Sequence, residues 1–446
     1  MNTQTAFPDW VSELDKCARC GTCRSVCPVF KQLSDETMVA RGRLVLIKAA
    51  LEKNLPISPY LTKIVDCCLL CLRCQTACPS LVKTGPAIQS ARAWLVKKQG
   101  LPLSLKFGFR IVLPHKKIYD FFMKLLSFTQ TALGRFFKNI KPLAGRPGQL
   151  RHLPFVFSNL LTPLNLGRQV PPIQSEPALK NLPGRYNAPH KKLTVAIFSG
   201  CLINYVYPQI LRSMTEVLRR AGISFILPKD QVCCGIPALV YGDTTTARRL
   251  ARKNIQALQP EKVDFILTAC GTCGQMLKEE YTTLYHGNKT DQLLTTQITA
   301  LRNKVIDVME FINKHTDLSP VQQKISTTYH TPCHFLWNNS AEITKSILQK
   351  ISDYQETDKE GLCCGGGGLF SLKYQKLGLA IGRLKMDTLS SFPAAGRISN
   401  QAPESRKSYL ITGCPGCMMQ LTWLLKETGM NYIQVAHSIE FFNRAL

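Results

Sequence analysis

Residues 193–313 alternate between short apolar runs and longer amphipathic runs. The apolar runs at 193–201, 223–228 and 263–270 are rich in Val, Ile, Leu and Phe, and they suit strands that are buried on both faces. The runs at 207–222 and 244–258 have helical periodicity. Strands that alternate with helices predict a parallel sheet covered by helices.

The same pattern returns once more toward the C-terminus. Four features recur in the same order. Segment 193–201 is matched by 325–333, 265–270 by 409–414, and 305–313 by 435–443, and the first Cys-Cys-Gly is matched by a second. Three of the four matched pairs are 130 to 132 residues apart, while the Cys-x-x-Cys pairs are 144 apart because residues 391–408 carry a polar insertion. We therefore predict a tandem repeat. Its halves, residues 193–315 and 316–446, are called the first and second cysteine-rich units.

Each cysteine-rich unit places five cysteines at or just beyond the C-terminal ends of its predicted strands, where open α/β sheets bind ligands. They are Cys201, Cys233, Cys234, Cys270 and Cys273 in the first unit, and Cys333, Cys363, Cys364, Cys414 and Cys417 in the second. Five thiols exceed what a tetrahedral zinc needs, so we expect an iron–sulfur cluster in each unit. Bare glycine backbone after each Cys-Cys pair would let N–H groups donate to sulfur.

Two other interpretations of these cysteines remain open. One is a zinc site in each unit. The other is a thioredoxin-like redox pair at each closing Cys-x-x-Cys, which leaves the Cys-Cys pairs unexplained. His330 and His334 flank Cys333, and we predict that they are hydrogen-bonded core or surface histidines and not ligands.

The N-terminal part contains the most specific motif. Two runs have the spacing C-x2-C-x2-C-x3-C-P, one at Cys17, Cys20, Cys23 and Cys27 and the other at Cys68, Cys71, Cys74 and Cys78. In this bacterial ferredoxin pattern the fourth Cys of each run binds the other cluster. We therefore predict two [4Fe–4S] clusters, one held by Cys17, Cys20, Cys23 and Cys78, the other by Cys68, Cys71, Cys74 and Cys27. A zinc pair fits this spacing poorly. Cys67 lies outside the spacing and is expected to be a spare buried thiol.

These patterns predict an α+β protein with four regions. Residues 1–91 form a helical two-cluster ferredoxin domain, here the ferredoxin unit, in which helices such as 44–53 link the cluster loops. Residues 92–192, the basic segment, are a basic amphipathic linker or docking segment. The two α/β cysteine-rich units, 193–315 and 316–446, follow.

The net charge of +27 is concentrated in the basic segment, which has 18 Lys and Arg against Asp120 and Glu176. Residues 118–140 interleave Phe, Leu and Ile with Lys and Arg at helical spacing, a composition that suits a helix on an anionic membrane surface. Docking on an acidic partner and an inert linker are the alternatives. Residues 141–192 are rich in Pro and Gly and are expected to be extended.

Several classes of protein lack support in the sequence. We expect neither a signal peptide nor a membrane-spanning helix, and 19 cysteines without an export signal indicate a reducing compartment. The chain has no G-x-G-x-x-G after a strand and no C-x-x-C-H, so no flavin, nicotinamide or attached haem is expected on it. The basic segment is not accompanied by a set of aromatic side chains that could stack on bases, which argues against nucleic-acid binding.

The motifs together resemble the iron–sulfur subunit of glycolate oxidase. The resemblance rests on the two ferredoxin runs, the two Cys-Cys-Gly units and the stretch Arg41-Gly42-Arg43, and it covers about residues 1–90 and 193–446. The anaerobic glycerol-3-phosphate dehydrogenase C subunit and the heterodisulfide reductase D and B subunits share this plan. Both closing Cys-x-x-Cys pairs are intact here, as in heterodisulfide reductase.

The resemblance implies an electron-transfer subunit. A separate FAD-containing subunit would oxidise a 2-hydroxy acid such as glycolate or lactate, and electrons would pass through this chain to a quinone or another acceptor. We expect the complex in the cytoplasm, with a possible peripheral position on the inner face of the membrane. The alternative is a heterodisulfide reductase-like catalytic subunit that reduces a disulfide at a non-cubane cluster.

Overall fold

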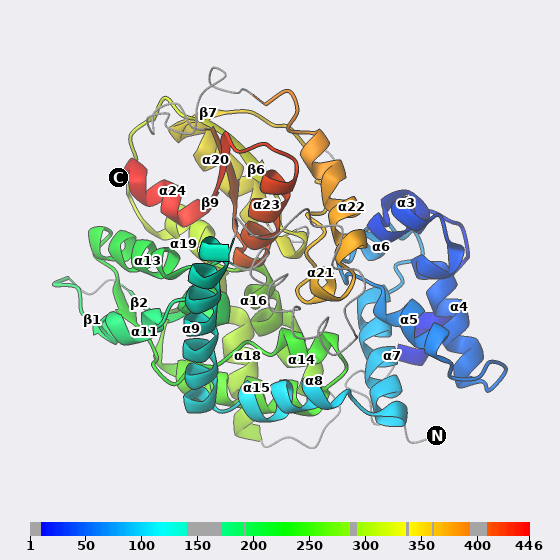
Figure 1. Cartoon of the computed structure of the whole chain (residues 1–446). Coiled ribbons are helices and arrows are strands. Elements are labelled where there is room, and N and C mark those ends of the chain that lie inside the picture. Colours follow the sequence, from blue (N-terminus) through cyan, green and yellow to red (C-terminus); the bar gives the residue numbers. More distant parts are fainter. Residues whose placement is uncertain are drawn as a thin grey trace.

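The computed structural model describes residues 10–140, 171–190, 193–285, 292–335, 339–358, 361–392 and 408–446, and side chains up to residue 131 within the first of these ranges. Figure 1 shows the helical ferredoxin unit on one side of two stacked α/β units. The second cysteine-rich unit lies above the first, and the ferredoxin unit lies beside α21 (Phe370–Lys373) and α22 (Gln375–Asp387) of the second. The predicted α+β class is confirmed.

The ferredoxin unit consists of short helices around the two cysteine loops. Ser58 caps α5 by accepting the amide of Leu61 at 3.1 Å, and Pro59 follows as the first helical residue. Its core contains Trp10, Leu44 and Ile88, all nearly inaccessible to solvent. The helices are α1 (Trp10–Asp15), α2 (Cys23–Val26), α3 (Pro28–Leu33), α4 (Ala40–Leu51), α5 (Pro59–Asp66), α6 (Arg73–Thr76) and α7 (Thr84–Gln99), with a 3₁₀ turn at Glu36–Met38.

The first cysteine-rich unit has a sheet in the order β1-β3-β2-β4-β5, parallel except for β1. All five residues of β2 are buried because helices cover both faces, as expected for a parallel strand. The strands are β1 (Arg185–Tyr186), β2 (Thr194–Phe198), β3 (Ser224–Ile226), β4 (Phe265–Thr268) and β5 (Val305–Asp307). The helices are α12 (Gly200–Tyr205), α13 (Pro208–Arg220), α14 (Ile236–Val240), α15 (Thr244–Leu258), α16 (Gly271–Gln275), α17 (Tyr281–Tyr285), α18 (Gln292–Lys304) and α19 (Val308–His315), with a π-helical turn at Met276–Glu280.

The second cysteine-rich unit repeats this arrangement with the all-parallel order β7-β6-β8-β9, equivalent to β3-β2-β4-β5. The predicted tandem repeat of parallel sheets is therefore confirmed. The strands are β6 (Ser326–His330), β7 (Asp353–Tyr354), β8 (Ser408–Thr412) and β9 (Ile433–His437). The helices are α20 (Ser340–Ile351), α21 (Phe370–Lys373), α22 (Gln375–Asp387), α23 (Pro415–Glu427) and α24 (Ser438–Ala445). Most of the polar insertion lies outside the described residues.

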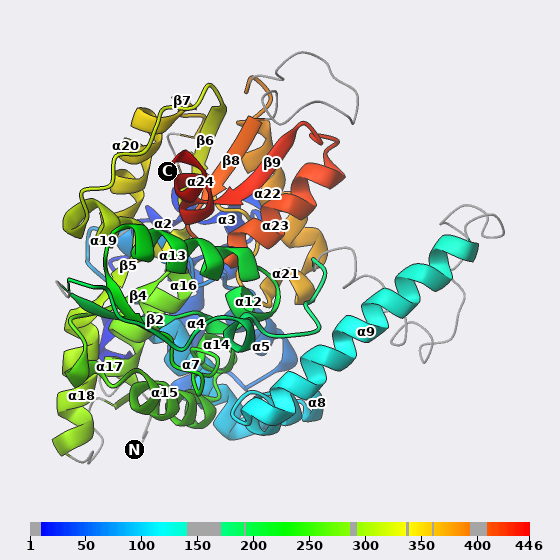
Figure 2. The same cartoon turned by 90° about the vertical axis from the view of Figure 1, so that its left-hand side faces the viewer.

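The basic segment is largely helical where it is described. It contains α8 (Leu103–Phe107), a π-helical turn at Gly108–Val112, α9 (Lys116–Ile140) and α11 (Ala178–Asn181). The helix expected at 118–140 is present as α9, which begins beside α8 at the first cysteine-rich unit and projects away from it toward its C-terminal end (Figure 2). Residues 141–170, part of the expected extended connection, lie outside the described residues. Near its end the basic segment adds β1 antiparallel to the edge of the first sheet.

The ferredoxin unit and the second cysteine-rich unit share a small apolar core. Val29, Met38 and Ile64 pack there with Phe370 and Ile381. At its border Asp66 receives the hydroxyl of Tyr374 at 3.0 Å and pairs with Lys373. These contacts hold the second ferredoxin loop against the loop that carries Cys363.

Candidate functional site

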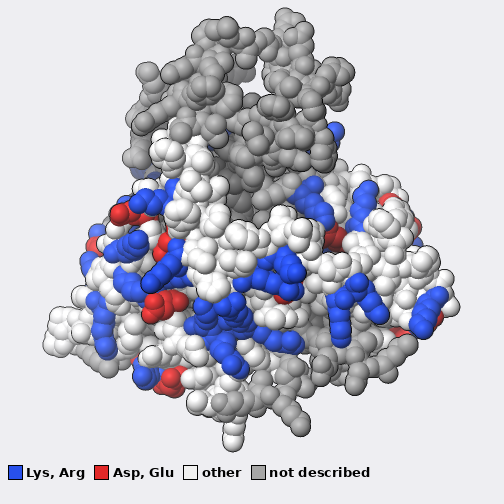
Figure 3. Space-filling view, turned by 60° about the horizontal axis from the view of Figure 1, so that its bottom comes forward, with Lys and Arg blue, Asp and Glu red and all other residues white. Residues whose placement is uncertain are grey.

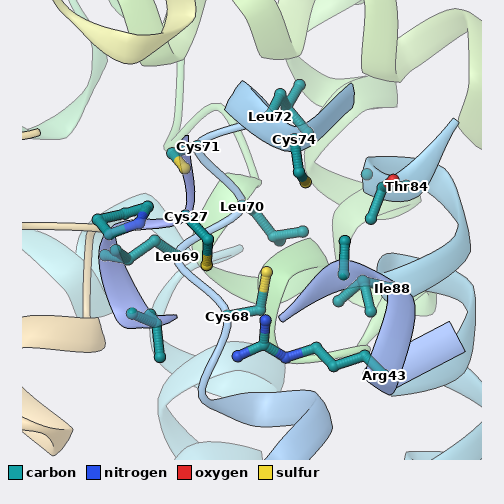
Figure 4. Close-up of a pocket in the computed structure, with 14 residues that line it drawn as sticks. Cys27, Arg43, Cys68, Leu69, Leu70, Cys71, Leu72, Cys74, Thr84 and Ile88 are labelled. Carbon is teal, nitrogen blue, oxygen red and sulfur yellow. The ribbon is translucent and has the colours of Figure 1, made fainter. Parts of the chain in front are cut away.

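Four cysteines of the ferredoxin unit line one pocket. They are Cys27 from the first run and Cys68, Cys71 and Cys74 from the second, arranged around the same space in Figure 4. Cys27 occupies the N-cap position of α3, Cys74 lies in α6, and the other two lie in the loop after α5. The structure thus brings together the same four thiols that the spacing predicts for one cluster. Four cysteine thiolates are the ligands that a [4Fe–4S] cluster needs.

The first cysteine loop is more open to solvent. Cys17 lies within electrostatic reach of Cys23, while Cys20 is exposed and its Sγ lies 3.4 Å from the hydroxyl of Thr22. Left-handed backbone at Arg19 and Gly21 makes the loop tight. Cys78 is half-buried just after α6, and its pairing with the first loop stays a prediction.

Two buried arginines hold the backbone around the second loop. Arg43, which is 2% exposed, donates to the carbonyl oxygens of Ile64 at 2.8 Å and Cys67 at 2.6 Å, and it lines the pocket (Figure 4). Arg92 donates to the carbonyls of Asp66 and Cys68 and, at 2.8 Å, to that of Val240 in the first cysteine-rich unit. Arg43 was recognisable in the sequence only as part of the Arg41-Gly42-Arg43 motif, and no sequence pattern marked Arg92.

The spare thiol of Cys67 is buried, as expected. It is 2% exposed, and burial raises its pKa to about 11. Its place in a small apolar core, outside the ligand spacing, suits a small apolar side chain.

The five cysteines of the first cysteine-rich unit form a continuous line of thiols beyond the ends of β2, β3 and β4. Side-chain hydrogen bonds join them in the order Cys201, Cys233, Cys234, Cys273 and Cys270. Gly235, with φ of 101°, turns the chain directly after the Cys-Cys pair. The hydrogen bond from Cys233 is the main cause that lowers the pKa of Cys234, which favours the thiolate that binds metals.

The second cysteine-rich unit repeats this line. The order is Cys333, Cys363, Cys364, Cys417 and Cys414, and the Sγ atoms of Cys364 and Cys417 are 3.7 Å apart. The amide of Gly365 donates to Cys363 Sγ at 3.3 Å, which is the bare-backbone contact expected from the glycine run. A Cβ at position 365 would lie 2.1 Å from the carbonyl oxygen of Gly378, so only glycine fits there.

The two lines of thiols meet each other at equivalent positions. A side-chain hydrogen bond joins Cys270 to Cys414, and the amide of Gly271 donates to the carbonyl of Gly413 at 3.2 Å. At the other end of the second line, Cys333 and Cys363 lie within electrostatic reach of Cys71 in the ferredoxin pocket. A series of close thiols therefore runs from the ferredoxin unit through the second cysteine-rich unit to Cys201.

A second pocket lies beside Cys201 and Cys233. The basic segment forms part of its wall through Lys116 and Tyr119. The hydroxyl of Tyr119 hydrogen-bonds to Cys201, and its ring packs edge-on against Tyr205, with ring centroids 5.0 Å apart. Sequence reasoning missed this role, because nothing in the spacing of α9 indicates which thiol it would contact.

The two histidines beside Cys333 differ. His334 behaves as predicted, with Nδ1 lying 3.1 Å from the hydroxyl of Thr272. The hydrogen bonding predicted for His330 is not found, because this side chain is 1% exposed and neither ring nitrogen has a hydrogen-bond partner among the described residues. Burial lowers its pKa to about 4, so its ring is neutral. One ring nitrogen and the Sγ atoms of Cys364 and Cys417 lie within 4.8 Å of one another.

Comparison with known families agrees with this layout. The family model described as "4Fe-4S dicluster domain" matches residues 13–82, and the model described as "Cysteine-rich domain" (CCG) matches twice, at 195–278 and 327–422. Together with the fold and the thiol sets, these matches define an iron–sulfur protein that joins a dicluster ferredoxin domain to two cysteine-rich domains.

Relatives cover nearly the whole chain. It is 26% identical to the probable glycolate oxidase iron–sulfur subunit of Bacillus subtilis, over 94% of this chain and 90% of that protein. It is 24% identical to the glycolate oxidase iron–sulfur subunit of Escherichia coli, over 98% of this chain and 95% of that protein. It is also 24% identical to a fumarate reductase (CoM/CoB) subunit of Methanothermobacter marburgensis, over 97% of this chain and 72% of that protein. The chain therefore contains a 4Fe-4S dicluster domain and two cysteine-rich domains, and its relatives include glycolate oxidase iron–sulfur subunits.

Proposed function

We propose that this chain passes electrons from a partner flavoprotein, which oxidises a 2-hydroxy acid such as glycolate or lactate, to a quinone. The names of its relatives support an oxidoreductase subunit with an iron–sulfur electron-transfer role. The observation that carries the proposal is the series of close thiols from Cys71 to Cys201. A chain that only stored iron or held a structural zinc would not need its metal-binding thiols in one connected line.

Iron–sulfur clusters, when bound, accept and release single electrons. The thiol contacts support one order of the four sites along the chain. The set at Cys17, Cys20, Cys23 and Cys78 comes first, followed by the pocket of Cys27, Cys68, Cys71 and Cys74. The five cysteines of the second cysteine-rich unit come next, and the five of the first unit are last. We infer that the flavoprotein docks at the exposed Cys20 end and that electrons leave beside Cys201.

The pocket beside Cys201 is the proposed acceptor site. Lys116 and the hydroxyl groups of Tyr119 and Tyr205 offer polar contacts to a carbonyl-bearing ring, while Leu113 and Leu179 give apolar walls. The same helix, α9, turns Phe121, Leu125 and Phe128 outward, and each is at least 45% exposed. Leu103 and Phe107 of α8 extend this apolar face.

The positive charge around this apolar face favours binding to an anionic membrane surface. Lys106, Arg110, Lys117 and Lys124 are exposed in and between α8 and α9. Figure 3 shows Lys and Arg outnumbering acidic residues on the adjoining face, where α8 and α15 lie. Basic side chains near apolar ones are attracted to anionic lipid. Within the part of the chain that the structure describes, no helix is long and apolar enough to cross a membrane.

The test is reduction of the chain by substrate in the presence of its flavoprotein. After anaerobic purification we expect about sixteen irons per chain, four for each of four [4Fe–4S]-type sites. Adding glycolate or lactate to the complex should produce reduced-cluster EPR signals that a quinone analogue then removes. A chain with about eight irons and two zincs would contradict the redox role of the cysteine-rich units.

The second candidate is a heterodisulfide reductase-like activity. It is favoured by the direct contact of the two thiol lines at Cys270 and Cys414 and by the relative whose name contains CoM/CoB. Anaerobic disulfide reduction by the chemically reduced chain would support it. Oxidation of the reduced chain by a quinone analogue but not by disulfides would support the first candidate.

A further inference from the structure

His330 is a polar side chain in an apolar position. It is the last residue of β6, and its backbone pairs with Thr412 of β8. The equivalent last residue of β2 is Phe198, which pairs with Thr268 of β4. The first unit therefore places a phenyl ring where the second places an imidazole, three residues before the cysteine that follows in each match. Buried polar atoms are normally hydrogen-bonded, so two ring nitrogens without a partner in the described part of the chain call for a ligand.

The surroundings of His330 have the geometry of a metal ion's ligand shell. The Sγ atoms of Cys364 and Cys417 are 3.7 Å apart. Two thiolates bound at about 2.3 Å to one tetrahedral ion lie roughly 3.8 Å apart, so these two sulfurs suit adjacent corners of one tetrahedron. A ring nitrogen of His330 lies within 4.8 Å of both sulfurs and can occupy a third corner after a small shift.

A second buried atom near the ring is also unpaired. Asp358 is 7% exposed and pairs through Oδ2 with the buried Lys385 at 2.8 Å, but its Oδ1 has no partner among the described residues. Asp358 lies within electrostatic reach of His330. Histidines that bind metals commonly direct their other N–H toward a carboxylate, which orients the ring.

We propose that His330 is a nitrogen ligand of the iron held by Cys364 and Cys417, so that the second cysteine-rich unit has a mixed sulfur and nitrogen ligand set and the first an all-sulfur one. The proposal rests on the iron–sulfur role proposed above. Imidazole in place of thiolate raises the potential of an iron–sulfur centre. The two sites, alike in their cysteines, therefore differ in potential.

The test uses the full chain, purified anaerobically with ¹⁵N-labelled histidine, and needs no substitution for its first readout. Pulsed EPR should detect a strongly coupled nitrogen that changes with the isotope. His330→Phe, which installs the residue of the equivalent position, should remove this coupling and lower one midpoint potential by about 59 mV or more, a tenfold change in a one-electron equilibrium. His334→Phe is the matched control and should keep both the coupling and the potential.

Three results would overturn the proposal. They are a wild-type signal without strong histidine coupling, a coupling that survives in His330→Phe, and zinc at this site. Full iron content without nitrogen coupling would remove only the role of His330. Absence of iron from both cysteine-rich units would refute the proposed function as well, so the two failures are distinguishable.

Discussion

The guanidinium of Arg73 donates a 2.6 Å hydrogen bond to the carbonyl oxygen of Gly361. Arg73 lies between Cys71 and Cys74, and Gly361 lies two residues before Cys363. The bond therefore connects the cysteine loop of the ferredoxin pocket to the Cys-Cys loop of the second cysteine-rich unit. Because the residues are 288 positions apart, it forms only when the two units are packed together.

Arg73→Ala should slow the passage of electrons between these two sites several-fold, because the loops lose a charge-assisted hydrogen bond that sets their spacing. Rapid-freeze EPR after addition of reductant would show the ferredoxin signals persisting. Arg73→Lys, which keeps the charge, should be less impaired, and iron content should be unchanged in both variants. Unchanged kinetics in Arg73→Ala would show that the packing of the units alone fixes the spacing.

Cys20→Ser should lower the iron content by about four atoms per chain and abolish one low-potential EPR signal, because one cluster loses a ligand. Iron analysis and redox titration measure both effects. Cys67→Ala is the matched control and should retain all iron, since Cys67 is a buried thiol outside the predicted ligand sets. Unchanged iron in Cys20→Ser would refute the assignment of the first loop.

Arg43→Met should lower the potential of the cluster assigned to Cys27, Cys68, Cys71 and Cys74 by roughly 60 mV, a tenfold change in a one-electron equilibrium. The reason is that a buried positive charge stabilises the more negative, reduced state. Arg43→Lys keeps the charge and should largely keep the potential. If both variants lower it equally, the hydrogen bonds of Arg43 and not its charge set the potential.

Phe121→Ser combined with Phe128→Ser should weaken binding to anionic vesicles, because α9 loses the two most exposed aromatic rings among its described side chains. Flotation with phosphatidylserine vesicles measures the binding, which should also fall as salt rises. Val321→Ser, at a 70% exposed apolar residue of the second unit, is the control. Equal binding to neutral vesicles at all salt concentrations would contradict the electrostatic part of the proposal.

Asp307 should make stability depend on pH. Burial raises its pKa to about 7, above the unfolded value of 3.8, so the folded state holds this proton more tightly. Stability from this group is fully present below about pH 4 and is lost as the pH rises to about 7. Asp307→Asn can still accept the amide of Met309 and cap α19. Its advantage over the wild type should therefore grow by roughly 3 kcal/mol between about pH 5 and pH 8.

Anaerobic thermal unfolding at the two pH values measures this effect. Glu216→Gln, at an exposed carboxylate paired with Arg220 in α13, should show no such change. A pH-independent difference between Asp307→Asn and the wild type would mean that Asp307 titrates at its ordinary pKa.

Local sequence patterns were sufficient to predict the elements of the fold. Strands such as Thr194–Phe198 are apolar throughout because both faces are covered, and that pattern is visible without the structure. The tandem repeat followed from matched spacing. The meeting of Cys27 with the second cysteine run also followed from spacing, because the length of each ferredoxin loop limits which thiols a cluster can reach.

Contacts between units were not predictable in the same way. Two examples are the hydrogen bond of Arg92 to Val240 and the contact of Tyr119 with Cys201, which join residues from different units. The sequence around each residue does not indicate which distant residue it contacts. The role of His330 was missed because a histidine at the end of a strand is usually hydrogen-bonded. Only the packed structure shows that its two nitrogens have no partner among the described residues.

The contact between Cys270 and Cys414 joins equivalent positions of two repeated units. If the two units were separate molecules, they would have to associate to form this contact, and the free energy of association would depend on their concentration. Within a single chain the effective concentration of one unit near the other is constant and high, so the contact persists even when the protein is scarce. Fusion also gives each half its own sequence, and so Phe198 and His330 can stand at the same position of two otherwise matching halves.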